Sequence, residues 1–100
     1  MIQVIYRGII KPDQEEPFRL KWEHVTKAML EKARGSHGMQ LLKNRDHPSE
    51  FMVVARWDSF DDWKSFWSGD LTRTEIFKDM FLSATLNSTE IFEEIQSLLQ

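Results

Sequence analysis

The run Phe51-Met52-Val53-Val54-Ala55 is apolar at every position. It follows the turn residues of segment 46–49, and its β-branched members favour a strand. Because successive side chains of a strand point to opposite faces, a strand that is apolar throughout needs cover on both faces. The sequence therefore predicts a sheet that is packed on each side, and this restricts the fold more than any other feature.

Two further segments are predicted to be strands of the same sheet. Residues 2–10 are rich in isoleucine and valine and form a first strand, with Ile5 and Ile9 on the face opposite to Ile2, Val4, Tyr6, Gly8 and Ile10. After a loop at 35–38, residues 39–45 and 50–57 are expected to pair as an antiparallel hairpin. Both faces of the first strand thus also carry apolar side chains.

A long helix is predicted between the first strand and the hairpin. Asp13 and Glu16 have the spacing of a capping box, and Pro17 is tolerated in a first turn, so the helix begins between Asp13 and Pro17. Its end is expected at Arg34-Gly35. One apolar stripe follows the helical period and comprises Phe18, Trp22, Val25, Met29 and Ala33.

A second, interrupted helical region follows the hairpin. Ser59 with Asp62, and Thr72 with Glu75, have capping-box spacing, and the first piece is expected to end at Gly69. The helical spacing of Phe60, Trp63 and Trp67 predicts that they pack into the core, although tryptophans here could also line a slot for a ligand. The second piece presents an apolar side formed by Ile76, Phe77, Met80, Phe81 and Ala84.

The C-terminal segment allows two interpretations. Ile91, Phe92, Ile95, Leu98 and Leu99 fit a helical stripe, whereas residues 88–96 could form a last strand that completes the sheet. Taken with the elements before it, a final strand gives the order strand, helix, strand, strand, helical region, strand.

This order is that of the ferredoxin-like α+β fold, a split βαβ arrangement with a four-stranded antiparallel sheet and the helices on one face. The other face would then expose four or five large apolar side chains, whose burial is worth roughly 6–15 kcal/mol before the cost of association. We therefore expect a homodimer in which two sheets face each other as a dimeric α/β barrel. The alternative is that the tail of the same chain covers this face.

Composition narrows the classes of function. The net charge is −3 and no run of lysine or arginine occurs, so a nucleic-acid partner is not expected. The chain has no cysteine, no signal-like start and no stretch of about 18 apolar residues. We expect one domain over residues 1–100, a cytoplasmic location and no membrane partner.

The sequence resembles the antibiotic biosynthesis monooxygenase family of the dimeric α+β barrel superfamily. The resemblance spans residues 2–95 and is carried by Gly38 before the second strand, by Arg56-Trp57-Asp58-Ser59 at the end of the third, and by the aromatic helix that follows. Segment 90–95, EIFEEI, is similar to the family's last strand, which favours a strand there.

The resemblance implies oxidation of a small aromatic or quinonoid compound by dioxygen, with no cofactor. Trp57 matches a tryptophan that lies at the substrate cleft in the actinorhodin-pathway enzyme type, and Trp63 stands where that type has a tyrosine. Val53, Lys43 and Phe77 replace an expected asparagine, histidine and arginine. An alternative is a non-catalytic, ligand-binding or stress-related barrel protein. Heme degradation is not expected, because Ile76 stands near the position of the histidine that ligates iron.

No catalytic base is evident from the sequence. His24 points away from the apolar stripe of its helix, whereas His37 and His47 lie in a loop and a turn, and the three lack the spacing of metal ligands. Arg7 and Arg56 are expected to pair with nearby carboxylates. Together with the resemblance, the sequence predicts a binding site for a small hydrophobic or aromatic molecule formed by Trp57, Trp63, Trp22, Tyr6 and Arg7. No metal site is expected, and the resemblance implies no cofactor.

Overall fold

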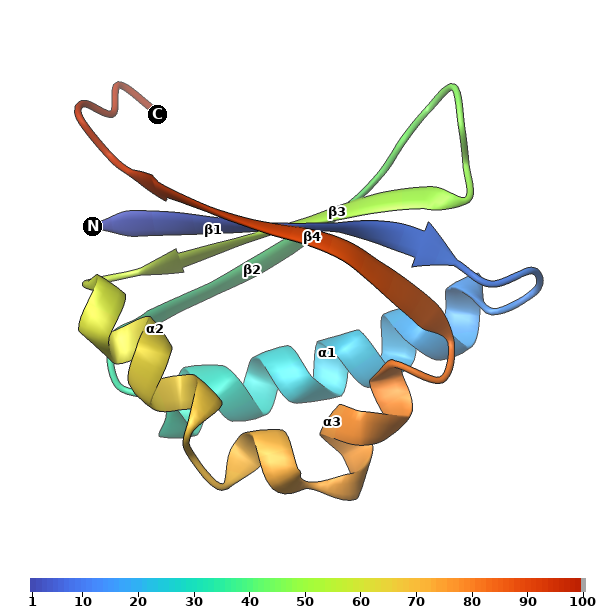
Figure 1. Ribbon diagram of the computed structural model, residues 1–100, viewed down its shortest axis with the longest axis horizontal. Coiled ribbons are helices and arrows are strands. Elements are labelled where there is room, and N and C mark those ends of the chain that lie inside the picture. Colours follow the sequence, from blue (N-terminus) through green and yellow to red (C-terminus); the bar gives the residue numbers. More distant parts are fainter. Residues whose placement is uncertain (100) are drawn as a thin grey trace.

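The computed structural model describes residues 1–99 and has the predicted α+β architecture (Figure 1). One antiparallel sheet lies on one side of the molecule, and the helices lie together on the other. The elements are, in order, β1 (Ile2–Ile10), α1 (Glu15–Lys32), β2 (Ser36–Lys43), β3 (Glu50–Trp57), α2 (Phe60–Trp67), a single 3₁₀ turn η1 (Leu71–Arg73), α3 (Glu75–Met80) and β4 (Ala84–Glu93). This confirms the ferredoxin-like fold.

The sheet has the order β2-β3-β1-β4. The first strand of the chain, β1, is therefore central and pairs with the last strand, β4, which lies at an edge. In β1, Tyr6 lies opposite Val53 of β3 and Thr89 of β4. The burial of β3 alternates strictly: Phe51, Val53, Ala55 and Trp57 are buried against the helices. The four strands thus present one set of side chains to the helices and the other set to a face that no described helix covers (Figure 1).

Helix α1 buries most of the predicted stripe and begins at Glu15, within the predicted range, but the predicted capping box does not form. Phe18, Val25 and Met29 are buried, and Pro17 lies in the first turn. The N-cap is Gln14 rather than Asp13, and no side chain caps the helix. Asp13 instead lies in the turn after β1 with a positive φ of 62°, a left-handed conformation that aspartate adopts more readily than most residues. It therefore precedes the N-cap position, and its carboxylate does not cap the helix.

The two capping boxes after β3 had different outcomes. The Ser59 hydroxyl accepts a hydrogen bond from the Asp62 N–H at 3.1 Å, which confirms the predicted start of α2. The Thr72 box was wrong, because that hydroxyl donates to the backbone oxygens of Trp67 and Gly69. Thr74 caps α3 in its place, through the Phe77 N–H.

Several strand boundaries also required correction. Strand β2 begins at Ser36, inside the expected loop, and ends at Lys43 rather than Arg45. Its early start follows from an irregularity between Ser36 and Met39, where Gly38 has a φ of 86° that suits glycine. Ala84 opens β4 instead of closing a helix, and β4 ends at Glu93. The last strand is confirmed, but it lies earlier than residues 88–96.

A bulge in β4 shifts the register between Arg7 and Gly8 of β1. Gly8 is required at this point, because a Cβ there would overlap the Thr85 carbonyl oxygen and lie 2.7 Å from the Phe51 ring. The bulge leaves Leu86 opposite Gly8 and Thr89 opposite Tyr6, both on the helix side of the sheet. The edge strand thereby bends while keeping an apolar side chain over the helices.

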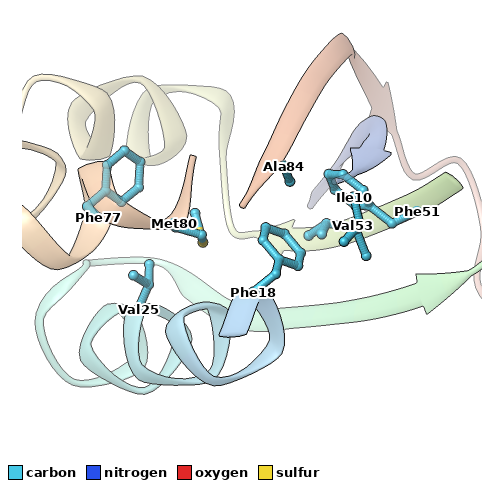
Figure 2. Close-up of a cluster of buried hydrophobic side chains, with 8 residues drawn as sticks. All are labelled: Ile10, Phe18, Val25, Phe51, Val53, Phe77, Met80 and Ala84. Atoms are coloured by element: carbon cyan, nitrogen blue, oxygen red, sulfur yellow. The ribbon is translucent and has the colours of Figure 1, made fainter. Parts of the chain in front are cut away.

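The core between sheet and helices consists of two clusters. The first is shown in Figure 2, where Phe18 of α1 points towards Val53 and Val25 points towards Phe77 and Met80 of α3. The second cluster lies at the other end of the sheet and contains Ile2, Val4, Met29, Ala55 and Trp57. Tyr6 and Phe66 pack against both clusters, so they lie at the junction between them.

The helix-free face of the sheet is partly apolar. Its apolar members are Ile5, Ile9, Leu42, Met52, Val54 and Phe92. Ile9, Leu42 and Phe92 are 42–50% exposed. The tail does not cover this face, because Ile95, Leu98 and Leu99 are 83–100% exposed. Among the described residues, no helix has the length and apolar character needed to cross a membrane.

Candidate functional site

An apolar cavity of about 60 Å³ lies between the sheet and the helices. All four strands contribute to its sheet wall, and α1, α2 and α3 form its helix wall. The lining residues with aromatic side chains are Tyr6, Phe18, Trp22, Phe51, Trp57, Phe66, Trp67, Phe77 and Phe81. Valine, methionine, alanine and leucine side chains complete the wall, so Tyr6 is the single ionisable group among the described residues that line the cavity.

Tyr6 is held in the wall by Trp63. The indole Nε1 of Trp63 donates a hydrogen bond to the Tyr6 hydroxyl at 2.9 Å, and the Trp67 ring centroid lies 6.4 Å from the Tyr6 ring. Burial raises the pKa of Tyr6 above its ordinary value of 10.0, and the hydrogen bond from Trp63 lowers it by less. At neutral pH the hydroxyl is therefore protonated and can act as a hydrogen-bond donor, but not as a base.

The predicted site residues are only partly brought together. Trp57, Trp22 and Tyr6 line the cavity, with Trp57 just 1% exposed. Trp63 does not line the cavity and contributes only through its hydrogen bond to the Tyr6 hydroxyl. Arg7 follows Tyr6 along β1, so it points to the helix-free face, where it pairs with Glu90 at 2.9 Å. Arg7 therefore lies outside the cavity.

The aromatic side chains of α2 are less buried than predicted. Phe60 is 45% and Trp67 is 38% exposed, and none of the residues of α2 is fully buried. The prediction that Phe60, Trp63 and Trp67 pack into the core was thus wrong for Phe60 and incomplete for the other two. The helix is short and lies at one end of the sheet (Figure 1), so only one side of it is covered.

Several lining residues were not recognised from the sequence as parts of a site. Phe66 packs on Trp57 with ring centroids 5.4 Å apart, and Leu86 reaches the cavity from β4. Phe51 and Val53 line the cavity from β3, but their run is apolar at every position, so the sequence did not show which of its two faces meets the helices. Leu86 depends on the bulge in β4, which the sequence did not indicate.

The cavity is smaller than a benzene-sized site. Engineered apolar cavities that bind benzene measure about 150 Å³. Trp67, Phe81 and Leu86 are 37–38% exposed and form the outer part of the wall. An aromatic ligand therefore has to displace side chains at this end, whereas a diatomic gas fits without rearrangement.

Polar groups elsewhere on the molecule are paired or peripheral. Arg56 binds Glu94 at 3.0 Å, which confirms the expected pairing of both arginines. His24 and His47 are exposed, and His37 pairs with Asp58 at 2.6 Å, so all three histidines lie outside the cavity, as predicted. Residues 1–99 contain no group of three histidine, aspartate or glutamate side chains suited to hold a metal ion.

The fold and the cavity define a ferredoxin-like α+β domain with an aromatic-lined site under its sheet. The sequence model of the antibiotic biosynthesis monooxygenase family matches residues 1–76, and the chain belongs to that family. No curated protein sequence matches the chain.

Solved structures with the same fold cover almost the whole chain. A candidate antibiotic biosynthesis monooxygenase from Deinococcus radiodurans covers 100% of this chain and is covered to 98%, with a TM-score of 0.78 at 13% identity. SnoaB from Streptomyces nogalater, described as a cofactor-independent oxygenase and solved as a point mutant, covers 99% and is covered to 97%, with a TM-score of 0.74 at 16% identity. Rv0793 from Mycobacterium tuberculosis shares 13% identity, with 98% of each chain covered and a TM-score of 0.69.

Proposed function

We propose that this chain is a cofactor-independent monooxygenase that acts with dioxygen on a small aromatic or quinonoid compound in the cavity under its sheet. The observation that carries the proposal is an apolar, aromatic-lined cavity with the Tyr6 hydroxyl held in its wall. Membership of the family supports it, and so does the fold shared with SnoaB, a cofactor-independent oxygenase.

The lining residues suit a reaction in which the substrate itself supplies the electrons. A phenol or an enolisable aryl ketone that loses a proton can pass an electron from the resulting anion to dioxygen. Trp57 and Trp22 would exclude water from the substrate anion and dioxygen, and would hold the aromatic rings of the substrate flat against apolar walls. The Tyr6 hydroxyl would donate a hydrogen bond to the substrate oxygen and stabilise negative charge there.

The described cavity wall offers no side chain that can act as the catalytic base. Tyr6 is the single ionisable residue among the described cavity-lining residues, and burial raises its pKa, so it does not take a proton at neutral pH. This observation favours the second candidate function, a non-catalytic or stress-related barrel protein that binds the same class of ligand. In the enzymatic role the substrate therefore loses its proton to water before it enters the cavity, and only the ionised fraction reacts.

We further propose that the protein is a homodimer whose two sheets face each other across the helix-free face. Ile5, Met52 and Val54 supply an apolar centre there, and Arg7–Glu90 and Arg56–Glu94 supply paired charges. A stable interface of ordinary size buries about 800 Å² on each partner. The exposed apolar side chains of this face would supply part of that area.

Oxygen uptake with a panel of anthrones and hydroquinones tests the proposal. Activity is expected with at least one class, to fall by about tenfold or more in Trp57→Phe and Tyr6→Phe, and to be unchanged in His47→Gln, which alters an exposed turn. Saturable binding of these compounds without oxygen consumption would exclude the monooxygenase and support the binding protein.

A further inference from the structure

The chain continues past β4 as a short apolar segment, residues 95–99, which we call the C-terminal arm. Ile95, Leu98 and Leu99 are 100%, 83% and 85% exposed, and Gln96 and Ser97 between them carry no charge. Single exposed apolar side chains are ordinary on a protein surface, but three within five consecutive uncharged residues are typical of a segment that binds another surface. Within residues 1–99, no other part of the chain buries these three side chains.

Glu94 fixes the base of the C-terminal arm. Its N–H donates a hydrogen bond to the Met1 carbonyl oxygen at 3.1 Å. Its carboxylate accepts hydrogen bonds from Gln3 at 3.2 Å and from Arg56 at 3.1 Å, and the side chain is only 11% exposed. The arm therefore leaves the sheet in a defined direction, on the side of the sheet away from the helices (Figure 1).

A groove of about 500 Å³ lies on the same helix-free face, at the opposite end of the sheet. Its lining includes the apolar side chains of Ile9, Leu42 and Met52, which alternation places on this face. Ile9 and Leu42 are 43% and 42% exposed. The hairpin of β2 and β3 lies at this end, so we call it the hairpin-end groove. The arm begins at the other end, where Glu93 pairs with Ile2.

The C-terminal arm is too short to reach the hairpin-end groove of its own chain. Strand β4 runs away from that groove, so the arm would first have to reverse direction, which takes at least about two residues. The remaining segment, 97–99, spans roughly 10 Å. Arg7, the lining residue of β1 nearest to the arm, is five positions from Ile2, or roughly 17 Å along the strand. The arm therefore needs a surface on another molecule.

A second copy of the chain brings this groove to the arm. When two sheets face each other about a two-fold axis that runs across the strands, each sheet is reversed relative to the other. The arm end of one copy then lies over the groove end of the other, across the roughly 10 Å that separates packed sheets. Five extended residues span roughly 17 Å, which is enough to cross this distance.

We propose that the C-terminal arm of each copy packs into the hairpin-end groove of the other, so that two exchanged arms close the two ends of the barrel. This exchange rests on the proposed homodimer and specifies the direction in which its two sheets face. The arm suits the groove chemically, because its isoleucine and leucine side chains meet apolar ones, and it brings no charge that would have to lose its water.

A cysteine cross-link tests the exchange on the full chain. The chain has no cysteine, so the double variant Leu42→Cys, Leu98→Cys carries two thiols, one in the groove and one on the arm. Both positions are exposed in the single chain, so the fold should tolerate the changes. Under mild oxidation at micromolar concentration, we expect disulfides between copies, and therefore a band of two linked chains on non-reducing electrophoresis.

Matched variants control for chance collisions between thiols. In Leu20→Cys, Leu98→Cys the first thiol lies on α1, on the helix side of the sheet, at a 51% exposed position. This variant should remain a single chain. The single variants Leu42→Cys and Leu98→Cys should also remain single chains, because the exchange places the two arms at opposite ends of the dimer.

Loss of the apolar arm measures its contribution to association. Leu98→Ser combined with Leu99→Ser removes two side chains that are exposed in the single chain, so its fold should be unaffected. We expect the Kd of the dimer to rise by about tenfold or more, because these side chains return to water when the dimer separates. Gln96→Ser, within the same arm, should leave the Kd nearly unchanged. Sedimentation equilibrium gives these values.

Three results would overturn the exchange: a disulfide within one chain of Leu42→Cys, Leu98→Cys, a Kd that the loss of both leucines leaves unchanged, or a weakened dimer that forms no cross-link. Each of these results leaves the proposed homodimer standing. A monomeric unaltered protein removes the dimer and the exchange together. Oxygen uptake decides the monooxygenase separately, because the cavity lies on the other side of the sheet.

Discussion

The Trp63 indole donates a hydrogen bond to the Tyr6 hydroxyl at 2.9 Å and so joins α2 to the middle of β1, across 57 residues of the chain. The bond orients the polar group of the cavity wall. It also ties a helix with no fully buried residue to the centre of the sheet.

A double-mutant cycle measures this bond. Tyr6→Phe and Trp63→Phe should each lower the free energy of unfolding, and the interaction between the two changes should be about 1 kcal/mol, the usual net value of a partly buried hydrogen bond. Urea unfolding of the two single variants and the double variant gives the value. Strict additivity of the two changes would show that the bond adds nothing to stability.

Alkaline pH should destabilise the protein through Tyr6. Burial raises the pKa of Tyr6 in the folded chain above the ordinary 10.0, so above that pH the folded state holds a proton that the unfolded state has lost. The contribution of Tyr6 is complete below pH 10.0 and is lost as the pH rises through the folded value.

The chain has a single tyrosine, so tyrosinate absorbance reports this group directly. The absorbance should develop above pH 10.0, and the stability of Tyr6→Phe should decline less over the same range. Ionisation of the native protein at or below the ordinary value would contradict the assignment of Tyr6 as a buried donor.

Acid should weaken the pair between Arg56 and Glu94. The hydrogen bond from Arg56 is the main cause that holds the pKa of Glu94 below its ordinary value of 4.5. This contribution is present above pH 4.5 and is lost as the pH falls through the lower folded value. Glu94→Gln should therefore lose less stability than the unaltered chain between pH 7 and pH 3, as measured by thermal unfolding. Glu90→Gln serves as the control, because it removes a carboxylate from the same face at a position that is more exposed than Glu94.

A charge at the centre of the helix-free face should separate the proposed dimer. Val54→Glu places a carboxylate among apolar side chains that would meet the second sheet, and the cost of removing it from water would oppose association. Sedimentation at micromolar concentration should give the mass of two chains for the unaltered protein and of one for this variant. Leu20→Glu, at a 51% exposed position on α1, should remain dimeric. A monomeric unaltered protein would refute the barrel.

Periodicity predicted the order of the elements up to the C-terminal segment, where the resemblance to the family favoured the last strand. The exact ends of the elements could not be predicted. The apolar stripe of α1 and the alternation of β1 are local patterns, and the structure confirms both. The Thr72 box failed because its hydroxyl finds backbone oxygens of the preceding turn, which only the folded chain brings near. The start of β4 at Ala84 depends equally on pairing with Ile10 across the sheet.

The site was predictable in composition but not in geometry. The tryptophans indicated an aromatic pocket, and the cavity contains Trp22 and Trp57. Nothing in the spacing of Tyr6 and Trp63 could reveal a hydrogen bond between residues so far apart in the chain. Arg7 was predicted to lie at the site, but alternation along β1 places it on the face opposite to Tyr6.

The narrowness of the cavity has a kinetic consequence. A ring-sized molecule is larger than the cavity, so it should enter only after side chains of the wall have moved, and the rate of association should lie well below the diffusion limit. At high ligand concentration the observed rate should level off at the rate of opening, a property of the protein and not of the ligand. Different ligands would then share one maximal rate of entry, and their affinities would differ through how slowly they leave.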